Sequence, residues 1–213
     1  GPEGVSKELV AAWDPFHPVV EELRAVRTQL LVRWFNPGGG RRTLVVTSPC
    51  AREGRSFIAA NLAVVFSQLG QRTLLIDADF RAPRQQGIFN ISDRFGLSSV
   101  LSGRSDLSAA APVAGITGLA VLPAGPLPPN PLELLSRGAF AALLARAQAE
   151  FDMIVIDTPP VTEYADASAV TFRAGDALMI SRKDHTRLVD TERAMRELGD
   201  ASARVVGTLM NAF

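Results

Sequence analysis

Six short apolar runs recur along the chain, with stretches of helical periodicity between them. We interpret the runs as β-strands, which are Thr43–Ser48, Thr73–Asp79, Leu119–Pro123, Met153–Thr158, Ala177–Ser181 and Val205–Met210. Several runs are apolar almost throughout, which is typical of strands covered on both faces. Because helices between such strands connect them in parallel, the pattern predicts an α/β fold, with a mostly parallel sheet and helices on both faces.

The segment ahead of the first strand, "HPVVEELRAVRTQLLVRWF", has the periodicity of an amphipathic helix. Its apolar stripe consists of Val19, Leu23, Val26, Leu30 and Trp34. The charged residues Glu21, Arg24 and Arg27 lie beside and opposite this stripe. Charge patterning by itself favours a solvated helix face for these three residues.

Polar residues cluster where the predicted strands end. Asp77 and Asp79 end the second strand, and Asp157 ends the fourth before two prolines. Asp77 and Asp79 share a face, because alternate residues of a strand point the same way. Ligands of doubly wound folds bind at the carboxyl ends of the strands. Each aspartate could be a helix cap or half of a buried ion pair, but their convergence on one edge favours a ligand or metal site.

The first strand runs into "TSPCAREGRSF", with a helical pattern beginning near Ala59. A phosphate-binding loop normally reads G-x-x-x-x-G-K-[ST] in this position. Pro49 replaces the first glycine and Arg55 replaces the lysine, whereas Gly54 and Ser56 match the pattern. Arginine keeps the positive charge but binds phosphate through a planar fork. The loop by itself is also compatible with an ordinary strand-turn-helix connection, and the neighbouring aspartates favour a phosphate site.

Composition narrows the function classes further. The 213 residues are 47% hydrophobic and carry 22 basic and 22 acidic side chains, which predicts one compact domain and no sequence-independent nucleic-acid binding. One cysteine and two histidines exclude a disulfide framework and an ordinary structural zinc site. Apolar stretches stop well short of the roughly 20 residues of a membrane span. We expect a cytoplasmic protein, and we interpret Gly1–Pro2 as a cleavage scar.

Three motifs together carry a family resemblance. "SPCAREGRS", "LLIDADFR" and "FDMIVIDTPP" resemble the Walker A, Walker A′ and Walker B motifs of the bacterial tyrosine kinases of exopolysaccharide synthesis. The likeness extends from the leading helix through "NLAVVFSQLG" and "LPAGPLPPNPLELLS" to "VVGTLMNAF". Within that family, the chain is similar to the EpsG-type chain-length-determinant kinases. The resemblance implies a MinD/ParA-related P-loop fold for residues 3–213, as a single kinase domain.

The resemblance also implies ATP or ADP and Mg²⁺ as ligands. It assigns catalysis to Asp77, Asp79 and Arg55, with Asp77 as general base for the tyrosine hydroxyl. It implies Mg²⁺ support from Ser56, Asp77, Asp79 and Asp157. Its nucleotide-binding positions are Arg52, Glu53, Gly54, Arg55, Ser56, Phe57, Arg182 and Asn211, the last two flanking the adenine. The chemistry implied is positioning and charge neutralisation.

The partners implied by the resemblance concern assembly and activation. Glu21, Arg24 and Arg27 match the E-x-x-R-x-x-R motif through which such kinases form rings, so the helix over about 18–35 becomes an oligomerisation element. The activator would be the cytoplasmic tail of a transmembrane polysaccharide co-polymerase, which places the protein at the inner membrane through that partner. Protein tyrosines would be the substrates. Tyr164 is the only tyrosine here, and a packed or interface role is favoured for it.

Three functional hypotheses remain from the sequence. The first is the ATP-dependent protein-tyrosine kinase that regulates exopolysaccharide polymerisation or export. The second is a partitioning-type ATPase, against which Cys50 weighs, since it stands where those proteins usually carry a signature lysine. The third is a nucleotide-binding scaffold with little or no catalysis, motivated by the altered loop and by the absence of a tyrosine-rich tail. Kinase and scaffold share one fold.

Overall fold

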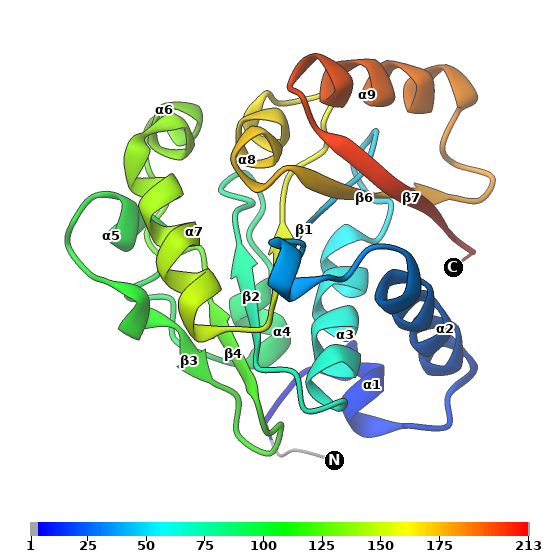
Figure 1. Cartoon of the computed structure of the whole chain (residues 1–213), viewed down its shortest axis with the longest axis horizontal. Coiled ribbons are helices and arrows are strands. Elements are labelled where there is room, and N and C mark those ends of the chain that lie inside the picture. Colours follow the sequence, from blue (N-terminus) through cyan, green and yellow to red (C-terminus); the bar gives the residue numbers. More distant parts are fainter. Residues whose placement is uncertain (1–3, 213) are drawn as a thin grey trace.

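The computed structural model describes residues 4–212, and within them the chain forms one seven-stranded sheet (Figure 1). Gly1–Pro2, interpreted as a cleavage scar, lie outside the described residues. The strand order is β3-β4-β2-β5-β1-β6-β7. The bounds are β1 Thr43–Thr47, β2 Thr73–Asp77, β3 Ala111–Pro112, β4 Leu119–Leu122, β5 Met153–Asp157, β6 Asp176–Arg182 and β7 Arg204–Asn211. Neighbouring strands are parallel except β3 and β4, so the predicted mostly parallel sheet is confirmed.

The predicted strands match six of the observed ones, with errors at their ends. The first four were predicted one or two residues too long at the carboxyl edge, where the chain leaves the sheet and enters the following loop. Residues 78–79, for example, belong to a turn that is held by hydrogen bonds to Asp77. The pattern missed β3, because a two-residue strand has no periodicity to detect.

Nine α-helices lie around the sheet within residues 4–212. They are α1 Val10–Trp13, α2 Pro18–Arg33, α3 Arg55–Ser67, α4 Gln85–Phe89, α5 Leu97–Leu101, α6 Pro131–Ser136, α7 Gly138–Glu150, α8 Asp166–Ala174 and α9 Leu188–Asp200. Helices α1 to α4 pack on one face, and α5 to α9 pack on the other. None of the helices formed by residues 4–212 is long and apolar enough to cross a membrane.

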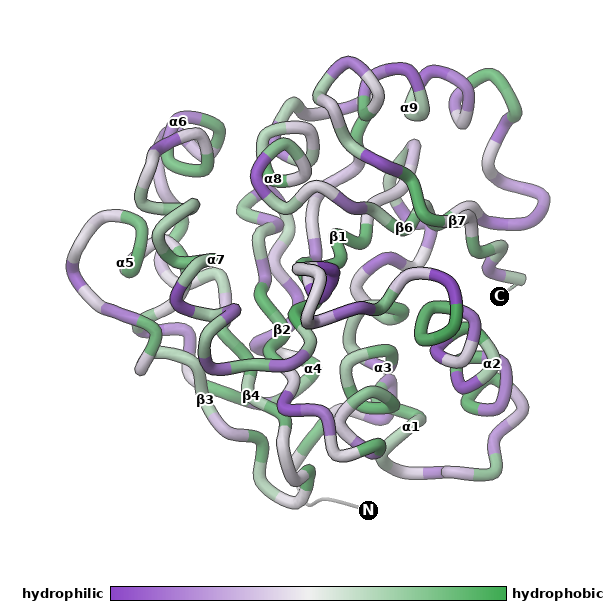
Figure 2. The backbone as a smooth tube through the Cα atoms, viewed as in Figure 1, coloured by the Kyte–Doolittle hydropathy of each residue, from purple (hydrophilic) through white to green (hydrophobic). Residues whose placement is uncertain are grey.

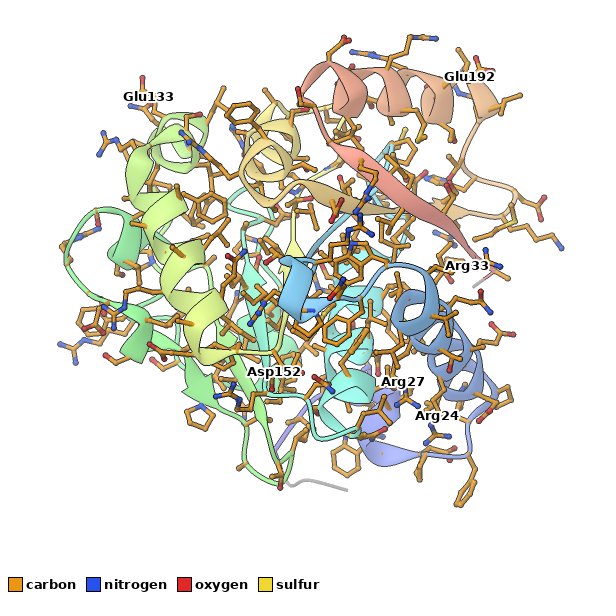
Figure 3. The ribbon with its side chains drawn as sticks, in the orientation of Figure 1. Arg24, Arg27, Arg33, Glu133, Asp152 and Glu192 are labelled. Atoms are coloured by element: carbon orange, nitrogen blue, oxygen red, sulfur yellow. The ribbon has the colours of Figure 1, made fainter. Side chains whose placement is uncertain are left out.

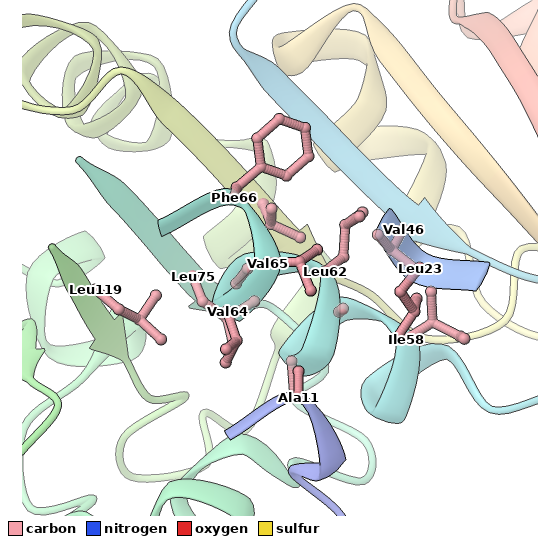
Figure 4. Close-up of a cluster of buried hydrophobic side chains, with 14 of the residues drawn as sticks. Ala11, Leu23, Val46, Ile58, Leu62, Val64, Val65, Phe66, Leu75 and Leu119 are labelled. Carbon is pink, nitrogen blue, oxygen red and sulfur yellow. The ribbon is translucent and has the colours of Figure 1, made fainter. Parts of the chain in front are cut away.

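The buried strands feed two cores through their alternating side chains. Leu44 and Val46 face the core under α3, whereas Val45 between them faces the core under α7 and α8. Figure 2 shows β1 and β2 as hydrophobic stretches in the middle of the molecule. In Figure 4, Val46 and Leu75 lie against side chains of α3, including Leu62. Burial on both faces explains the unbroken apolar runs of the sequence.

Helix α2 confirms the amphipathic pattern of the leading segment. The ring nitrogen Nδ1 of His17 caps it by accepting from the backbone N–H of Val19 at 3.2 Å, and Pro18 occupies the first turn. Four of the five stripe residues are buried and Val26 is partly buried. At its end, the indole N–H of Trp34 donates to Oδ2 of Asp176 at 2.8 Å, which ties the helix to β6.

Candidate functional site

The carboxyl ends of three adjacent strands bring the three motifs together. Strand β5 lies between β1 and β2, and Asp157 is in register with Val46 on one side and Asp77 on the other. The loop after β1, the turn after β2 and the end of β5 therefore share one edge of the sheet. The three motifs therefore meet at the carboxyl edge of the sheet, as the sequence predicts.

The loop after β1 ends at the start of α3, which begins at Arg55, four residues before the predicted start near Ala59. The chain turns through left-handed conformations at Arg52 (φ 62°) and Gly54 (φ 88°). A Cβ on Gly54 would lie 2.3 Å from Nδ2 of Asn211. Any other residue at position 54 would be strained by the backbone conformation and would have to displace the side chain of Asn211. The N-terminus of α3 and the loop amides form the kind of frame that binds anions.

Arg55 is buried and is bound on all sides by protein oxygens. Its Nε donates to the carbonyl of Thr158 at 2.8 Å, and Nη1 donates to Oγ of Ser48 at 2.7 Å and to the carbonyl of Cys50 at 3.1 Å. Its Nη2 lies 3.5 Å from Oδ2 of Asp79. The predicted cation thus lies inside the loop, linked to both neighbouring motifs.

Asp77 is fully buried at the end of β2, and backbone N–H groups surround its carboxylate. Oδ1 accepts from the N–H of Asp79 at 3.0 Å, and Oδ2 accepts from those of Arg84 and Gln85, each at 3.0 Å. Oδ1 of Asp79 accepts two more backbone N–H groups from the same turn, at 3.0 and 2.9 Å. The two aspartates lie close together as predicted, but a turn and not strand alternation brings them together. Oδ2 of Asp77 accepts backbone N–H groups, whereas Oδ2 of Asp79 faces the guanidinium of Arg55.

Asp157 is fully buried at the end of β5 and is only half satisfied. Oδ2 accepts from the side-chain amide of Gln85 at 2.8 Å, and Oδ1 has no hydrogen-bond partner among the described residues. The sequence analysis missed Gln85. No motif marks it, because its position depends on the turn that brings residue 85 back over β5.

The burial of these carboxyl groups changes their acidity. Burial raises the pKa of Asp77 well above its ordinary value, and the neighbouring Asp157 raises it further. Burial also raises the pKa of Asp157, to about 6, although Arg55, Ser56 and Gln85 favour its charged form. The site therefore holds two interacting acidic groups that accept protons more readily than exposed aspartates.

The donor set suits a magnesium ion bound together with a phosphate. The carboxylate oxygen Oδ1 of Asp157 is free among the described residues, and the hydroxyl-bearing Ser56 lies in the first turn of α3. No group of three or more His, Cys, Asp or Glu side chains among residues 4–212 is arranged to hold a metal. Mg²⁺ does not require such a group, since it usually keeps several waters and binds through one or two carboxylates and phosphate oxygens.

Glu53 stabilises the loop from inside and does not face outward. Its side chain is fully buried, and Oε2 accepts from the N–H of Cys50 at 3.0 Å. Oε1 accepts from the hydroxyl of Thr186, in the connection between β6 and α9. The carboxylate of Glu53 therefore fixes the loop, and the nucleotide-binding role of this residue stays a prediction for its backbone.

Arg182 and Asn211 end β6 and β7 beside the loop, as predicted. Nη1 of Arg182 donates to the carbonyl of Arg52 at 3.1 Å, and Nδ2 of Asn211 donates to the carbonyl of Glu53 at 3.2 Å. Both side chains thus contact the loop backbone. The side chain of Phe57 packs partly buried against the core under α3.

Residues after β5 support the opposite side of the loop, and the sequence analysis did not assign them a site role. Oε1 of Glu163 accepts from the N–H of Ala51 at 2.9 Å, and the hydroxyl of Thr162 donates to the carbonyl of Pro49 at 2.7 Å. Tyr164 follows them, and its ring lies under the guanidinium of Arg81, 4.5 Å from the centroid. Tyr164 is exposed apart from this contact, so it is not packed in the core, and an interface role for it stays a prediction.

The three residues of the predicted assembly motif on α2 differ in their surroundings, and Figure 3 labels two of them, Arg24 and Arg27. Nη1 of Arg24 donates to the carbonyl of Pro15 at 2.8 Å and to Oε2 of Glu21 at 3.2 Å. Nη1 of Arg27 donates to the carbonyl of Val65 on α3 at 2.6 Å, and burial lowers its pKa. Glu21 is exposed, so a fully solvated face describes Glu21 but not Arg27.

Comparisons with known proteins agree with this geometry. The ParA family model, described as NUBPL iron-transfer P-loop NTPase, matches residues 41–212. The chain is 34% identical over 207 residues to tyrosine-protein kinase YwqD of Bacillus subtilis, covering 97% of this chain and 86% of that protein. It is 32% identical to tyrosine-protein kinase wzc of Salmonella typhimurium, where it spans only 28% of the relative's length.

Solved structures show the same relationship. The chimerical protein CapA2B2 superposes with a TM-score of 0.90 at 31% identity, covering 98% of this chain and 91% of that one. The kinase domain of Escherichia coli tyrosine kinase ETK gives 0.90 at 31%, covering 96% and 79%. MinD of Pyrococcus horikoshii shares the fold, with a TM-score of 0.69 at 20% identity and coverage of 81% and 70%. On this evidence the chain belongs to the bacterial tyrosine-protein kinase family, within the P-loop NTPase fold.

Proposed function

We propose that the chain is an ATP-dependent protein-tyrosine kinase domain. The observation that carries the proposal is the contact network in which Arg55 of the loop pairs with Asp79 of the second motif while Asp157 of the third lies beside Asp77. Phosphoryl transfer needs an anion-binding frame, a metal-binding carboxylate and a base at one place. Membership of a family with named tyrosine kinases supports this activity over other P-loop reactions.

The nucleotide would bind over the loop and the N-terminus of α3. The backbone N–H groups of the loop and Arg55 would bind the phosphates, and Arg52, Arg182 and Asn211 would border the nucleotide. Ser56 and Asp157 would hold Mg²⁺, with Asp79 supporting it through Arg55. The bound metal supplies charge neutralisation on the phosphate oxygens.

Asp77 is the proposed general base. Three backbone N–H groups fix its carboxylate, so it cannot rotate away from the site. Its raised pKa increases its affinity for a proton, as a base that accepts the proton of a tyrosine hydroxyl requires. The proton moves from the substrate hydroxyl oxygen to a carboxylate oxygen of Asp77 as the phosphoryl group is transferred.

We further propose that this domain works in an oligomer beside a transmembrane polysaccharide co-polymerase whose cytoplasmic tail activates it. The chain would then lie in the cytoplasm, at the inner membrane through that partner, and would regulate exopolysaccharide polymerisation or export. Support comes from the motif on α2 and from the kinship with YwqD and wzc.

One observation favours a second function, that of a nucleotide-binding scaffold. The guanidinium of Arg55 already has four oxygen partners within the protein, two of which are loop groups. Phosphate must compete with these partners for the cation, which would weaken binding or slow turnover relative to a lysine loop. A partitioning-type ATPase has less support, since the MinD likeness at 20% identity concerns the fold.

The test is Mg²⁺-dependent ATP binding and turnover of the purified chain, with and without a co-polymerase tail peptide and a tyrosine-containing acceptor. Arg55→Ala should abolish binding, and Asp77→Asn should abolish phosphotyrosine formation while ADP still binds. Arg146→Ala is the matched control, because Arg146 is an exposed arginine on α7. Binding without turnover under every condition would favour the scaffold, and absence of binding would reject both functions.

A further inference from the structure

Gln85 is a fully buried residue that contacts all three motifs of the site. Its backbone N–H donates to Oδ2 of Asp77 at 3.0 Å. Its side-chain Nε2 donates to Oδ2 of Asp157 at 2.8 Å and to the carbonyl of Ser56 at 3.1 Å. One side chain therefore links Ser56, the second residue of α3, to the carboxylate at the end of β5.

The orientation of the Gln85 amide follows from its neighbours. Nε2 donates to the carbonyl oxygen of Ser56, which cannot donate, and to the carboxylate of Asp157, which in its ionised form only accepts. A flipped amide would place Oε1 against two acceptors. Oε1 must therefore point away from Ser56 and from Oδ2 of Asp157.

Two buried acceptors at this place lack a donor among the described residues: Oε1 of Gln85 and Oδ1 of Asp157. A buried polar atom without a partner costs about 1–3 kcal/mol, and a charged one costs more. Such groups occur where a ligand or water completes them. Because their two side chains are hydrogen-bonded to each other, both atoms belong to one cluster at the end of β5.

We propose that Gln85 is a positioning residue for the metal carboxylate. By holding Oδ2 of Asp157, Gln85 directs Oδ1 toward Mg²⁺ or its waters, and its own Oε1 accepts a hydrogen bond from a water of the same shell. Residues that orient a metal-binding side chain in this way typically contribute about 10-fold to 100-fold in metal affinity. The inference rests on the proposed function, because it requires a magnesium nucleotide at this site.

The test compares Gln85→Met with Gln86→Met. Methionine keeps the length of glutamine but removes its hydrogen bonds. The side chain of Gln86 also has a buried Oε1 without a donor among the described residues, but its Nε2 donates to the carbonyl of Pro83 and not to Asp157. ADP affinity is measured by calorimetry in Mg²⁺ and in EDTA. We expect Gln85→Met to lose about 10-fold to 100-fold of the affinity that Mg²⁺ adds, with ADP affinity in EDTA within about 2-fold of the parent. Gln86→Met should retain the full Mg²⁺ effect.

The outcomes separate this inference from the proposed function. An unchanged Mg²⁺ effect in Gln85→Met, or an equal loss of ADP affinity in Mg²⁺ and in EDTA, would overturn the positioning role while leaving the nucleotide site. If the parent chain binds no ADP, the proposed function and this inference both fail. If circular dichroism shows Gln85→Met to be unfolded, Gln85→Asn replaces it, because the shorter amide cannot span the same two oxygens.

Discussion

At the scale of single residues, the positive charge of Arg55 is surrounded by oxygen atoms of the protein itself. Arg55 has donors in a planar fork, and the structure uses them on four oxygens from three chain segments. A lysine has three donors on one nitrogen and could not satisfy this set with the same geometry. The arginine that replaces the usual lysine therefore holds the loop together through hydrogen bonds to Ser48 and Cys50.

Because burial raises the pKa of Asp157, we expect the contribution of this group to the free energy of unfolding to fall as the pH rises. Its pKa is about 6 when folded and about 3.9 when unfolded, so the folded state binds the proton more tightly. Stability from this group is therefore present at low pH and is lost as pH rises through 6. Without nucleotide and metal, Asp157→Asn should raise the free energy of unfolding at pH 7.5 by about 2 kcal/mol, or roughly 4–8 °C in melting temperature, and the gain should shrink at pH 5.

The control for this prediction is Asp152→Asn, which should behave in the opposite way. Hydrogen bonds from Arg72 lower the pKa of Asp152, so its charged form stabilises the fold at neutral pH. Thermal melts of the three proteins at both pH values are the measurement. A destabilised Asp157→Asn at pH 7.5 would show that the folded protein stabilises the charged carboxylate.

Gly54 gives a second prediction at this scale. Gly54→Ala must adopt φ near 88° and place its Cβ on the amide of Asn211. Gly70→Ala shares the left-handed conformation, at φ 78°, but meets nothing within 4 Å. In urea unfolding, Gly70→Ala should cost roughly 1–2 kcal/mol and Gly54→Ala clearly more, with weaker ADP binding. Equal losses would mean that Asn211 moves aside freely.

At the scale of elements, α2 is both a structural layer and the candidate assembly surface. Arg27 is tied to the backbone of α3, and Trp34 is tied to β6. Glu21 is exposed and shares only Arg24 as an ion-pair partner among the described residues. Within the predicted assembly motif, the loss of Arg27 would therefore also disturb packing, whereas the loss of Glu21 would not.

This difference leads to a prediction for α2. Arg27→Ala should lower the free energy of unfolding by about 1–2 kcal/mol, because it removes a charged hydrogen bond to Val65. Glu21→Lys should leave the unfolding midpoint nearly unchanged, yet it should shrink the assembly measured by light scattering. An unchanged mass for Glu21→Lys would return the face to the solvated-helix interpretation.

At the scale of the whole molecule, the two cores share one sheet, and the N-terminal helices pack against it. We therefore expect residues 3–213 to unfold as a single cooperative unit. With Trp13 replaced by phenylalanine, the fluorescence of Trp34 reports on the docking of α2 against β6. Far-ultraviolet circular dichroism reports on the sheet and all helices. The two urea transitions should coincide. Separate midpoints would identify the leading helices as an independent unit.

Much of the fold could be predicted, because buried parallel strands leave unbroken apolar runs and helices leave a period of 3.6. Asp77, Asp79 and Asp157 were placed correctly because strand ends in parallel sheets share an edge. The start of α3 and the strand β3 were wrong or missed. Strand β3 has two residues, which is too short to show a period. The first residues of α3 belong to the loop motif and do not follow the helical apolar pattern.

The sequence by itself determined the fold class, the order of the three motifs and the edge at which they meet, because periodicity and spacing are local properties. Only the tertiary structure decided which atoms are free. Gln85 reaches Asp157 across 72 positions of the chain, Thr186 reaches Glu53 across 133, and Arg27 turns inward to α3. Hydrogen bonds between distant segments leave no pattern in one sequence, since their geometry exists only once the chain has folded.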